Sequence, residues 1–463
     1  MLYFPEKERI GRIMEEKQLF SNQRLRKLII PLVLEQGLTI LVGMCDGVMV
    51  SSVGEAAISG VSLVDMINAV VLTLFAALAT GGAVVTSQYL GARQEEKARH
   101  SAGQLVLLSL GLGLTAMLLC LIWARGLLKL FFGSIEAEVL EAGLIYLRIT
   151  ALSFPFIALY NAGAAIFRSS GNSKVSMQVS LLMNGINVAG NALCIFVLKM
   201  GVAGVAVPTL VSRAVAAVVI LALAAGKQQP LALTRNSLRQ IDKPMMGRIL
   251  RIGIPSACEN SFFQLGRLVV VSMIALFGTT QTSANAVANT LDSVGIVVGQ
   301  AMGLAMVTVV GQSVGAGDLK QVKYYVKKLM LWTYVLLGAS NMLLLACVDP
   351  AVGLYRSLSP ETAQLAKQLV QIHAFFAIFL WPASFVLPNA LRAANDAKFT
   401  MWVGVGSMLT FRVVGSWILC VQLGWGALGV WAAMVMDWVC RIAFFVPRMV
   451  GGRWQEKCSL SER

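Results

Sequence analysis

Long apolar runs dominate this sequence, and they restrict the folds open to the chain more than any other feature. A helix needs about 20 mostly apolar residues to cross a membrane, and twelve segments fit that description. Hydrophobic residues make up 57% of the chain and charged residues 13%, whereas soluble domains have about 25% charged residues. The sequence predicts an all-α polytopic membrane protein with spans at roughly 28–50, 61–86, 104–123, 139–164, 176–198, 204–225, 249–275, 285–310, 329–348, 367–390, 400–421 and 427–449.

Lysine and arginine are spread unevenly over the connecting segments. With the N-terminus placed in the cytoplasm, 29 of the 38 fall in segments predicted to lie inside and 5 in outside loops. Basic residues favour the cytoplasmic side. We therefore expect a multi-pass protein of the plasma (inner) membrane with both termini in the cytoplasm. The net charge of +15 then reflects orientation against lipid headgroups, not nucleic-acid binding.

The two halves of the chain repeat each other at an offset of 224 residues. Each half has six spans, an even number, so both halves share one orientation. Two similar lobes facing a common cavity are typical of transporters. The offset relates Pro31 to Pro255, Glu35 to Glu259, Gln88 to Gln312, Gly91 to Gly315 and Arg168 to Arg392.

The repeat and the polar stretch between its copies predict five parts. A charged N-terminal segment precedes a first six-span lobe. A polar linker with two prolines separates that lobe from a second one, and a short tail follows. The expected boundaries are 1–27, 28–225, 226–248, 249–449 and 450–463.

Several motifs give the chain a family resemblance. The first span has Pro31, fourteen residues and then Asp46, followed by MVSSVGEAAISGVSLVD. The sequences QYLGA and QSVGA follow spans 2 and 8, and NxxNxxxN in span 5 precedes GVAGVAxxT. In this order and spacing the motifs resemble multidrug and toxic compound extrusion (MATE) transporters. The resemblance implies two six-helix bundles in a V shape, exporting amphipathic or cationic drugs against Na⁺ or H⁺ entry.

Two carboxylates in the first span share one helix face. Glu35 and Asp46 are eleven residues apart, which places them about 20° apart around the helix and about 16 Å apart along it. The repeat distinguishes them, since Glu35 recurs as Glu259 whereas Asp46 aligns with Val270. A carboxylate kept in one half indicates a task performed by one lobe.

The resemblance implies what that task is. In MATE relatives the matching aspartate belongs to a cation or proton site with partners in spans 5 and 6. Here the matching partners are Asn187, Asn191 and Thr209. The family often has aspartate where this chain has Asn191, which leaves one full negative charge and does not decide between Na⁺ and H⁺. Their oxygens are suitable ligands for a small cation, although a role of Asp46 in helix packing alone remains open.

The repeated glutamates could have any of three roles. Glu35 and Glu259 lie near the predicted cytoplasmic ends of spans 1 and 7, where they could act as gates or as contacts between lobes. They could equally pair with Arg24 and Arg248, each eleven residues upstream. We therefore place both glutamates at the substrate cavity or its gate.

A second polar feature is mirrored between the halves. Span 2 has Asp65 and Asn68, and span 8 has Asn289 and Asp292, so the offset exchanges acid and amide. The family resemblance places these spans where the lobes meet. The four residues are predicted to line a cation-attracting cavity, the alternative being paired hydrogen bonds between helices.

Other buried polar residues are expected to be structural. Arg213, Arg267 and Arg412 lie within spans and are predicted to form salt bridges inside the bundles. His373 lies in an apolar stretch and is read as a packing residue, with proton transfer as the alternative.

The leading functional hypothesis is a secondary active multidrug exporter that is functional as a monomer. A lipid-linked oligosaccharide flippase of the same superfamily is the alternative, and it would need a strongly basic cavity. No cofactor is expected beyond Na⁺ or H⁺ as coupling ion, with Na⁺ at Asp46 the one metal considered. A membrane enzyme is a remote alternative, because the sequence contains no HExxH, G-x-S-x-G or Walker A motif.

Overall fold

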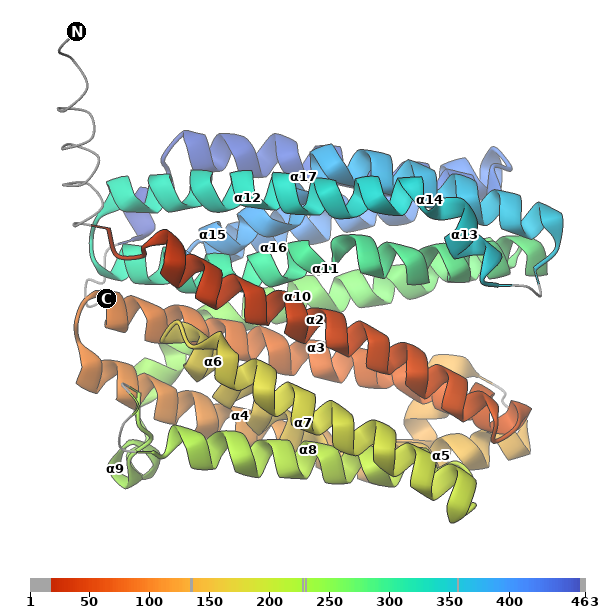
Figure 1. Cartoon of the computed structure of the whole chain (residues 1–463), viewed down its shortest axis with the longest axis horizontal. Coiled ribbons are helices and arrows are strands. Elements are labelled where there is room, and N and C mark those ends of the chain that lie inside the picture. Colours follow the sequence, from red (N-terminus) through yellow and green to blue (C-terminus); the bar gives the residue numbers. More distant parts are fainter. Residues whose placement is uncertain (1–17, 134–135, 227–228, 230, 356–357, 459–463) are drawn as a thin grey trace, which may run out of the picture.

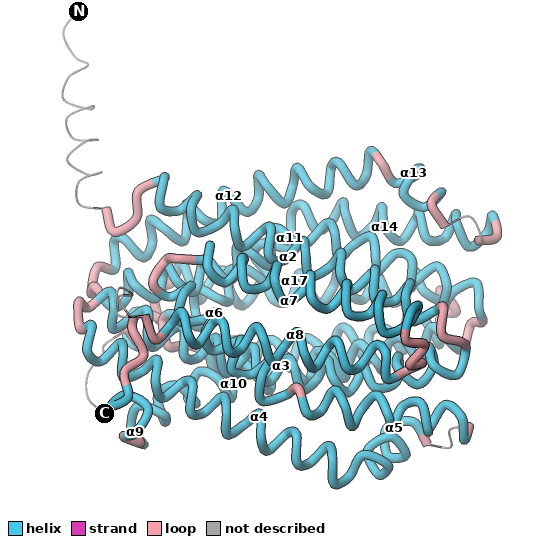
Figure 2. The backbone as a smooth tube through the Cα atoms, turned by 60° about the horizontal axis from the view of Figure 1, so that its bottom comes forward, coloured by secondary structure: helices cyan, strands magenta, loops and turns pink. Residues whose placement is uncertain are grey.

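The computed structural model describes residues 18–133, 136–226, 229, 231–355 and 358–458. Within these ranges every regular element is a helix and none is a strand, as Figure 2 shows. The fold class expected from the apolar runs is therefore correct. Most of the predicted N-terminal segment, residues 1–17, lies outside the described residues, as does the end of the predicted tail, 459–463.

Helices occupy all six positions predicted for the first half. The fourth crossing is two helices bent by 45°; Pro155 starts the second one and has no N–H to continue the first. The fifth crossing ends in a π-helix. The elements are α2 (Asn22–Ser51), α3 (Glu55–Gly91), α4 (Glu95–Phe132), α5 (Ala137–Leu152), α6 (Phe154–Ser169), α7 (Ser173–Ala192), η1 (Leu193–Val197) and α8 (Ala203–Ala224).

The second half also has helices at its six predicted positions, with more π-helix. Three π-helical segments interrupt its fourth and fifth crossings, a deviation that is frequent at functional sites. The elements are α10 (Lys243–Ala275), α11 (Thr279–Gly315), α12 (Leu319–Ala346), α13 (Val348–Gly353), α14 (Pro360–Trp381), η2 (Pro382–Val386), α15 (Leu387–Ala393), α16 (Ala397–Ser407), η3 (Met408–Val414), η4 (Trp417–Gln422), α17 (Gly426–Val450) and the 3₁₀-helix η5 (Gln455–Lys457).

By length and hydropathy, ten helices in the described ranges could cross a membrane, or eleven when the bent pair α5–α6 counts as one. The remaining predicted span, α10, has 33 residues. It is long enough but is not among those that pass, and its charged residues include Lys243, Arg251 and Arg267. Composition thus supports ten or eleven spans where we predicted twelve.

The two halves of the chain lie one above the other in Figure 1, with red to yellow-green helices below and cyan to blue helices above. The main contacts between them involve α2 and α3: α2 packs against α7 of its own half and α11 of the other, and α3 packs against both α10 and α11. Because α2 contacts both halves, a change in the contacts of its side chains can alter how the two halves pack against each other.

The tightest approach between the halves occurs where α3 and α11 end. A Cβ atom added to Gly91 would overlap the carbonyl group of Gln312, and one added to Gly315 would overlap that of Gln88. The two clashes are equivalent under the 224-residue offset. Only glycine allows backbones to come so close. We call this region, Gln88–Gly91 with Gln312–Gly315, the closed end.

The predicted linker is more ordered than a loop. It contains α9 (Arg235–Arg239), which begins with a capping box at Thr234, and α10 begins at Lys243, six residues earlier than predicted. Gln104 of α4 holds the linker through hydrogen bonds to the carbonyl oxygens of Ser237 (3.2 Å) and Gln240 (2.7 Å). The linker is therefore fixed against the first half.

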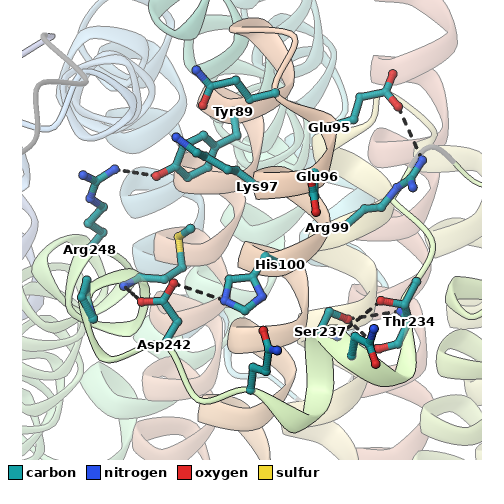
Figure 3. Close-up of a pocket in the computed structure, with 15 residues that line it drawn as sticks. Tyr89, Glu95, Glu96, Lys97, Arg99, His100, Thr234, Ser237, Asp242 and Arg248 are labelled. Atoms are coloured by element: carbon teal, nitrogen blue, oxygen red, sulfur yellow. Dashed lines mark hydrogen bonds and ion pairs between the residues drawn. The ribbon is translucent and has the colours of Figure 1, made fainter.

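A cavity of about 1450 Å³ lies beside this contact (Figure 3). His100 faces Asp242 at 3.2 Å, and Arg248 donates a hydrogen bond to the Tyr89 hydroxyl. The charged residues that line the cavity are of both signs: three are acidic and three are basic. They are Glu95, Glu96 and Asp242, and Lys97, Arg99 and Arg248. The mixture suits a solvated junction between linker and helices.

Candidate functional site

Asp46 lies at the meeting point of α2, α7 and α8. Its Oδ1 accepts a hydrogen bond of 2.8 Å from the Asn191 amide. Asn187 satisfies its neighbours when its amide nitrogen faces Asp46, 3.1 and 3.2 Å from the two carboxylate oxygens, and its oxygen accepts from the Thr209 hydroxyl at 3.1 Å. The structure thus brings together all four residues of the predicted coupling site.

The polar atoms of this cluster are suited to interact with a proton or a small cation. Asn191 is fully buried, yet its Oδ1 has no hydrogen-bond partner in the described part of the chain. Two amide groups donating to Asp46 suit an ionised carboxylate, which can only accept. Rotation of an amide would present oxygen instead, and carboxylate, amide and hydroxyl oxygens together suit Na⁺. A proton on Asp46 would remove an acceptor from the same amides.

The second carboxylate of the first half lies near this cluster. Asp65 on α3 is close enough to act electrostatically on Asp46, and the Arg213 guanidinium on α8 acts on both. Asn68 donates to Asp65 at 3.4 Å, and the Tyr146 hydroxyl also lies against that carboxylate. The polar centre of the first half therefore contains two carboxyl groups, those of Asp46 and Asp65, and one guanidinium group, that of Arg213.

Arg213 does not form the salt bridge we expected. Its Nη1 donates to the Ser153 hydroxyl at 2.8 Å, and Ser153 is the residue at the bend between α5 and α6. The guanidinium therefore ties α8 to this bend, with Asp65 and Asp46 as nearby charges.

The repeated glutamates are paired, but not with Arg24 or Arg248. Glu35 lies 3.3 Å from Arg168 and accepts a 2.8 Å hydrogen bond from Ser176. Glu259 lies 2.6 Å from Arg392, the repeat equivalent of Arg168. The suggested pairing eleven residues upstream is wrong, because each acid faces inward to its own bundle. The shared offset of the two pairs was the sequence signal that could have identified the partners.

A cavity of about 570 Å³ opens in the second half, between α10, α11 and the crossings that follow. Asn289 and Asp292 line it, as does Glu259. Asp65 and Asn68 do not, so the structure does not unite the four mirrored residues in one wall. Asp292 Oδ1 instead faces His373 Nδ1 at 2.9 Å. His373 thus lies against a carboxylate, and its ring also packs edge-on against Trp431 and Trp438, as expected of a packing residue.

Sequence analysis missed the basic character of this cavity. Arg267, Arg392, Arg412 and Arg441 all line it, together with Trp381 and Trp438. Arg441 pairs at 3.1 Å with Asp437, which lies four residues before it on α17. The salt bridges expected for Arg267 and Arg412 are absent among the described residues. No spacing in the sequence shows which arginines lack a partner.

Comparison with known proteins identifies the family. The model of the MatE family matches residues 31–193 and 255–418. The chain is 26% identical to the uncharacterized transporter YisQ of Bacillus subtilis (strain 168) over 90% of this chain and 91% of that protein. It is 25% identical to the probable multidrug resistance protein NorM of Thermotoga maritima, over 95% and 94% respectively.

Solved structures agree on the fold. An outward-facing structure of a multidrug resistance MATE family transporter superposes with a TM-score of 0.87 at 21% identity, covering 95% of this chain and all of that one. The family match spans more than half of the sequence and falls on both repeats. The chain therefore belongs to the MatE family of membrane transporters.

Proposed function

We propose that this protein is a secondary active multidrug exporter, an antiporter that couples the efflux of amphipathic or cationic compounds to the entry of Na⁺ or H⁺. The observation that carries the proposal is the Asp46 cluster. It is a polar centre built around a carboxylate that the repeat does not duplicate, since Val270 stands at the equivalent position. Relatives named as multidrug resistance proteins support the substrate class.

Coupling works through the hydrogen bonds of Asp46. In the ion-free state Asp46 holds α2 to α7 through Asn191. A proton or Na⁺ on the carboxylate changes which of its neighbours can donate to it. Since α2 also packs against α11, the altered helix contact changes how the two halves fit. The altered contact shifts the equilibrium between a state in which the closed end is shut and a state in which it is open.

The other polar residues have supporting roles in this proposal. The lobes are 28–225 and 249–449, joined by the linker 226–248. Asn289 and Asp292 face substrate in the cavity of the second half, Asp65 and Asn68 belong to the polar centre around Asp46, and Glu35 and Glu259 stabilise the helices around the gate. With both termini cytoplasmic, the closed end faces the cytoplasm. The protein works as a monomer in the plasma membrane.

Reconstituted vesicles test the proposal. Purified protein is inserted into liposomes loaded with a fluorescent cationic dye, and either a Na⁺ or an H⁺ gradient is imposed. We expect dye movement against its own gradient with one of the two ions, and collapse of that movement when an ionophore dissipates the gradient. Dye movement that is the same with and without any ion gradient would overturn ion coupling.

A further inference from the structure

The cavity of the second half has an excess of positive charge. Glu259 lies 2.6 Å from Arg392 and 3.6 Å from Arg441, and Arg441 is also paired with Asp437. Asp292 faces His373. These contacts account for every carboxylate at the cavity within the described ranges, and two guanidinium groups are left over.

The two remaining groups are Arg267 and Arg412. Neither has a carboxylate oxygen within 4.0 Å in the described part of the chain. Arg412 interacts electrostatically with Asp437 and, more weakly, with Arg267, Arg441 and Asp292, so the two cations without a close carboxylate belong to one cluster of charges. Grouping like charges away from bulk water is unfavourable unless something balances them. A ligand with a negative charge would provide that balance.

Hydrogen-bond donors in the cavity also lack acceptors. Arg412 Nε, Arg392 Nε and Trp438 Nε1 are buried atoms without a partner among the described residues. All three side chains line the cavity, and the Trp438 side chain is almost wholly buried. Buried donors are normally satisfied. Three such donors around one space favour an occupant that accepts hydrogen bonds.

Aromatic rings stand beside the arginines. The Arg412 guanidinium carbon is 5.2 Å from the Phe263 ring centre, and that of Arg441 is 5.1 Å from the Phe385 ring centre. Phe385 in turn stacks on Trp381 with ring centres 5.1 Å apart. Rings and guanidinium planes both offer flat surfaces on which another aromatic group can stack. The occupant therefore combines an aromatic body with an acidic group.

The opposite charge of the two halves follows from their alignment. The repeat offset is 225 at GVAG (201–204) and GALG (426–429), near spans 6 and 12. Asp46 is replaced by Val270. The second half thus lacks the key carboxylate of the first half and carries a cation, Arg412, within its fifth crossing. Arg412 also lies in the π-helix η3, where local geometry departs from the regular helix.

From these observations we propose that the cavity of the second half is a binding site for the carboxylate of an amphipathic aromatic acid, held by Arg267 and Arg412 and stacked against Phe263, Phe385 and the tryptophans. The inference rests on the proposed export function and assigns residues of this chain to the acidic group of an amphipathic substrate. The binding itself needs no gradient, so it can be tested separately from transport.

The test uses two probes of nearly identical shape, naphthalene-1-acetate and the neutral naphthalene-1-acetamide. Their affinities are measured by calorimetry on the full-length protein in detergent at low salt. We expect the acid to bind about tenfold more tightly, as a charge-assisted hydrogen bond provides. Arg412→Gln and Arg267→Gln remove this preference while amide binding persists, which also shows that the variants are folded. Arg412→Lys keeps part of the preference because it keeps the charge.

A matched control is Arg148→Gln, which removes an exposed arginine of α5 outside the cavity and should leave the preference intact. Equal affinities of acid and amide in the unaltered protein, or a preference that survives in the Arg267→Gln/Arg412→Gln double variant, would overturn the proposal. Dye export under an ion gradient is recorded in parallel. Failed export with an intact acid preference counts against the exporter alone, not against this site.

Discussion

Gln88 and Gln312, 224 positions apart, make the same contact from opposite halves of the molecule. Gln88 Nε2 donates to the Ala393 carbonyl oxygen at 2.8 Å, and Gln312 Nε2 donates to that of Ser169 at 2.7 Å. Ala393 and Ser169 are themselves equivalent under the offset. The closed end is therefore held by a two-fold set of bonds between glutamine side chains and the opposite backbone.

A cross-link at the closed end should arrest transport. A Cβ atom placed on Gly311 would lie 2.9 Å from that of Ser87. This is shorter than the about 3.5–4.5 Å of a disulfide, so the two helices must separate slightly for the bond to form. In a protein whose eight native cysteines are replaced, Ser87→Cys/Gly311→Cys should cross-link on oxidation and lose export. Reduction should restore it. The two single variants are the controls, and full export by the cross-linked protein would show that this end need not open.

The Glu35–Arg168 pair should contribute to stability. Both side chains are largely shielded from water, with 6% and 14% of their surface exposed. Glu35→Gln leaves a buried arginine without its counter-ion, and we expect a loss of about 3–5 kcal/mol in the free energy of unfolding. Glu35→Gln/Arg168→Gln should recover part of this loss, because no charge is left unpaired.

Thermal unfolding in detergent measures these two variants together with Arg168→Gln, which completes a double-mutant cycle. Glu259→Gln and Arg392→Gln repeat the experiment in the second half, where Arg441 also contacts Glu259. Additive effects of the two changes in either half would mean that the pair is not coupled.

The spans and the repeat could be predicted because they depend on local hydropathy and on identities at a fixed offset. The helices are longer than predicted because their polar ends add no apolar signal. For example, α3 and α11 each have 37 residues, or about 56 Å, against a hydrocarbon core of about 30 Å. The π-helices and the bend at Ser153 left no pattern that periodicity can detect.

The segment after α17 should protect the Cys458 thiol from reaction with maleimide. Burial and the nearby Asp396 carboxylate raise the pKa of Cys458 from 9.0 to about 12. Asp396 also pairs with Arg448 at 2.7 Å and with Lys457. The thiolate is the reactive form, so maleimide at pH 7.5 should label Cys458 far more slowly than the exposed Cys347.

Asp396→Asn is the companion variant for the labelling experiment. It removes the nearby negative charge and should speed the labelling of Cys458. Raising the pH to about 9 should leave Cys458 mostly protonated in the unaltered protein, since this lies well below its pKa. Equal labelling of Cys458 and Cys347 at pH 7.5 would contradict this account of the segment.

The candidate site was only partly predictable. The polar cluster of the first half could be predicted because the spacing of its residues matches a family pattern. Its members are Asp46, Asn187, Asn191 and Thr209. The partners of Glu35 and Glu259 lie on other helices, and the unpaired state of Arg267 and Arg412 depends on three-dimensional distances. Sequence shows that a charge is within a span, but packing decides which charges meet.

The most direct test of the account is gradient-driven export by Asp46→Asn. This change keeps the shape of the side chain and its contact with Asn191, but it removes the ionisable group. Glu55→Gln, an exposed acid at the start of α3, is the matched control and should export normally. The account predicts that Asp46→Asn, folded and inserted, exports dye no faster than protein-free vesicles under either ion gradient. Export at the rate of the unaltered protein would contradict the assignment of Asp46 as the coupling carboxylate.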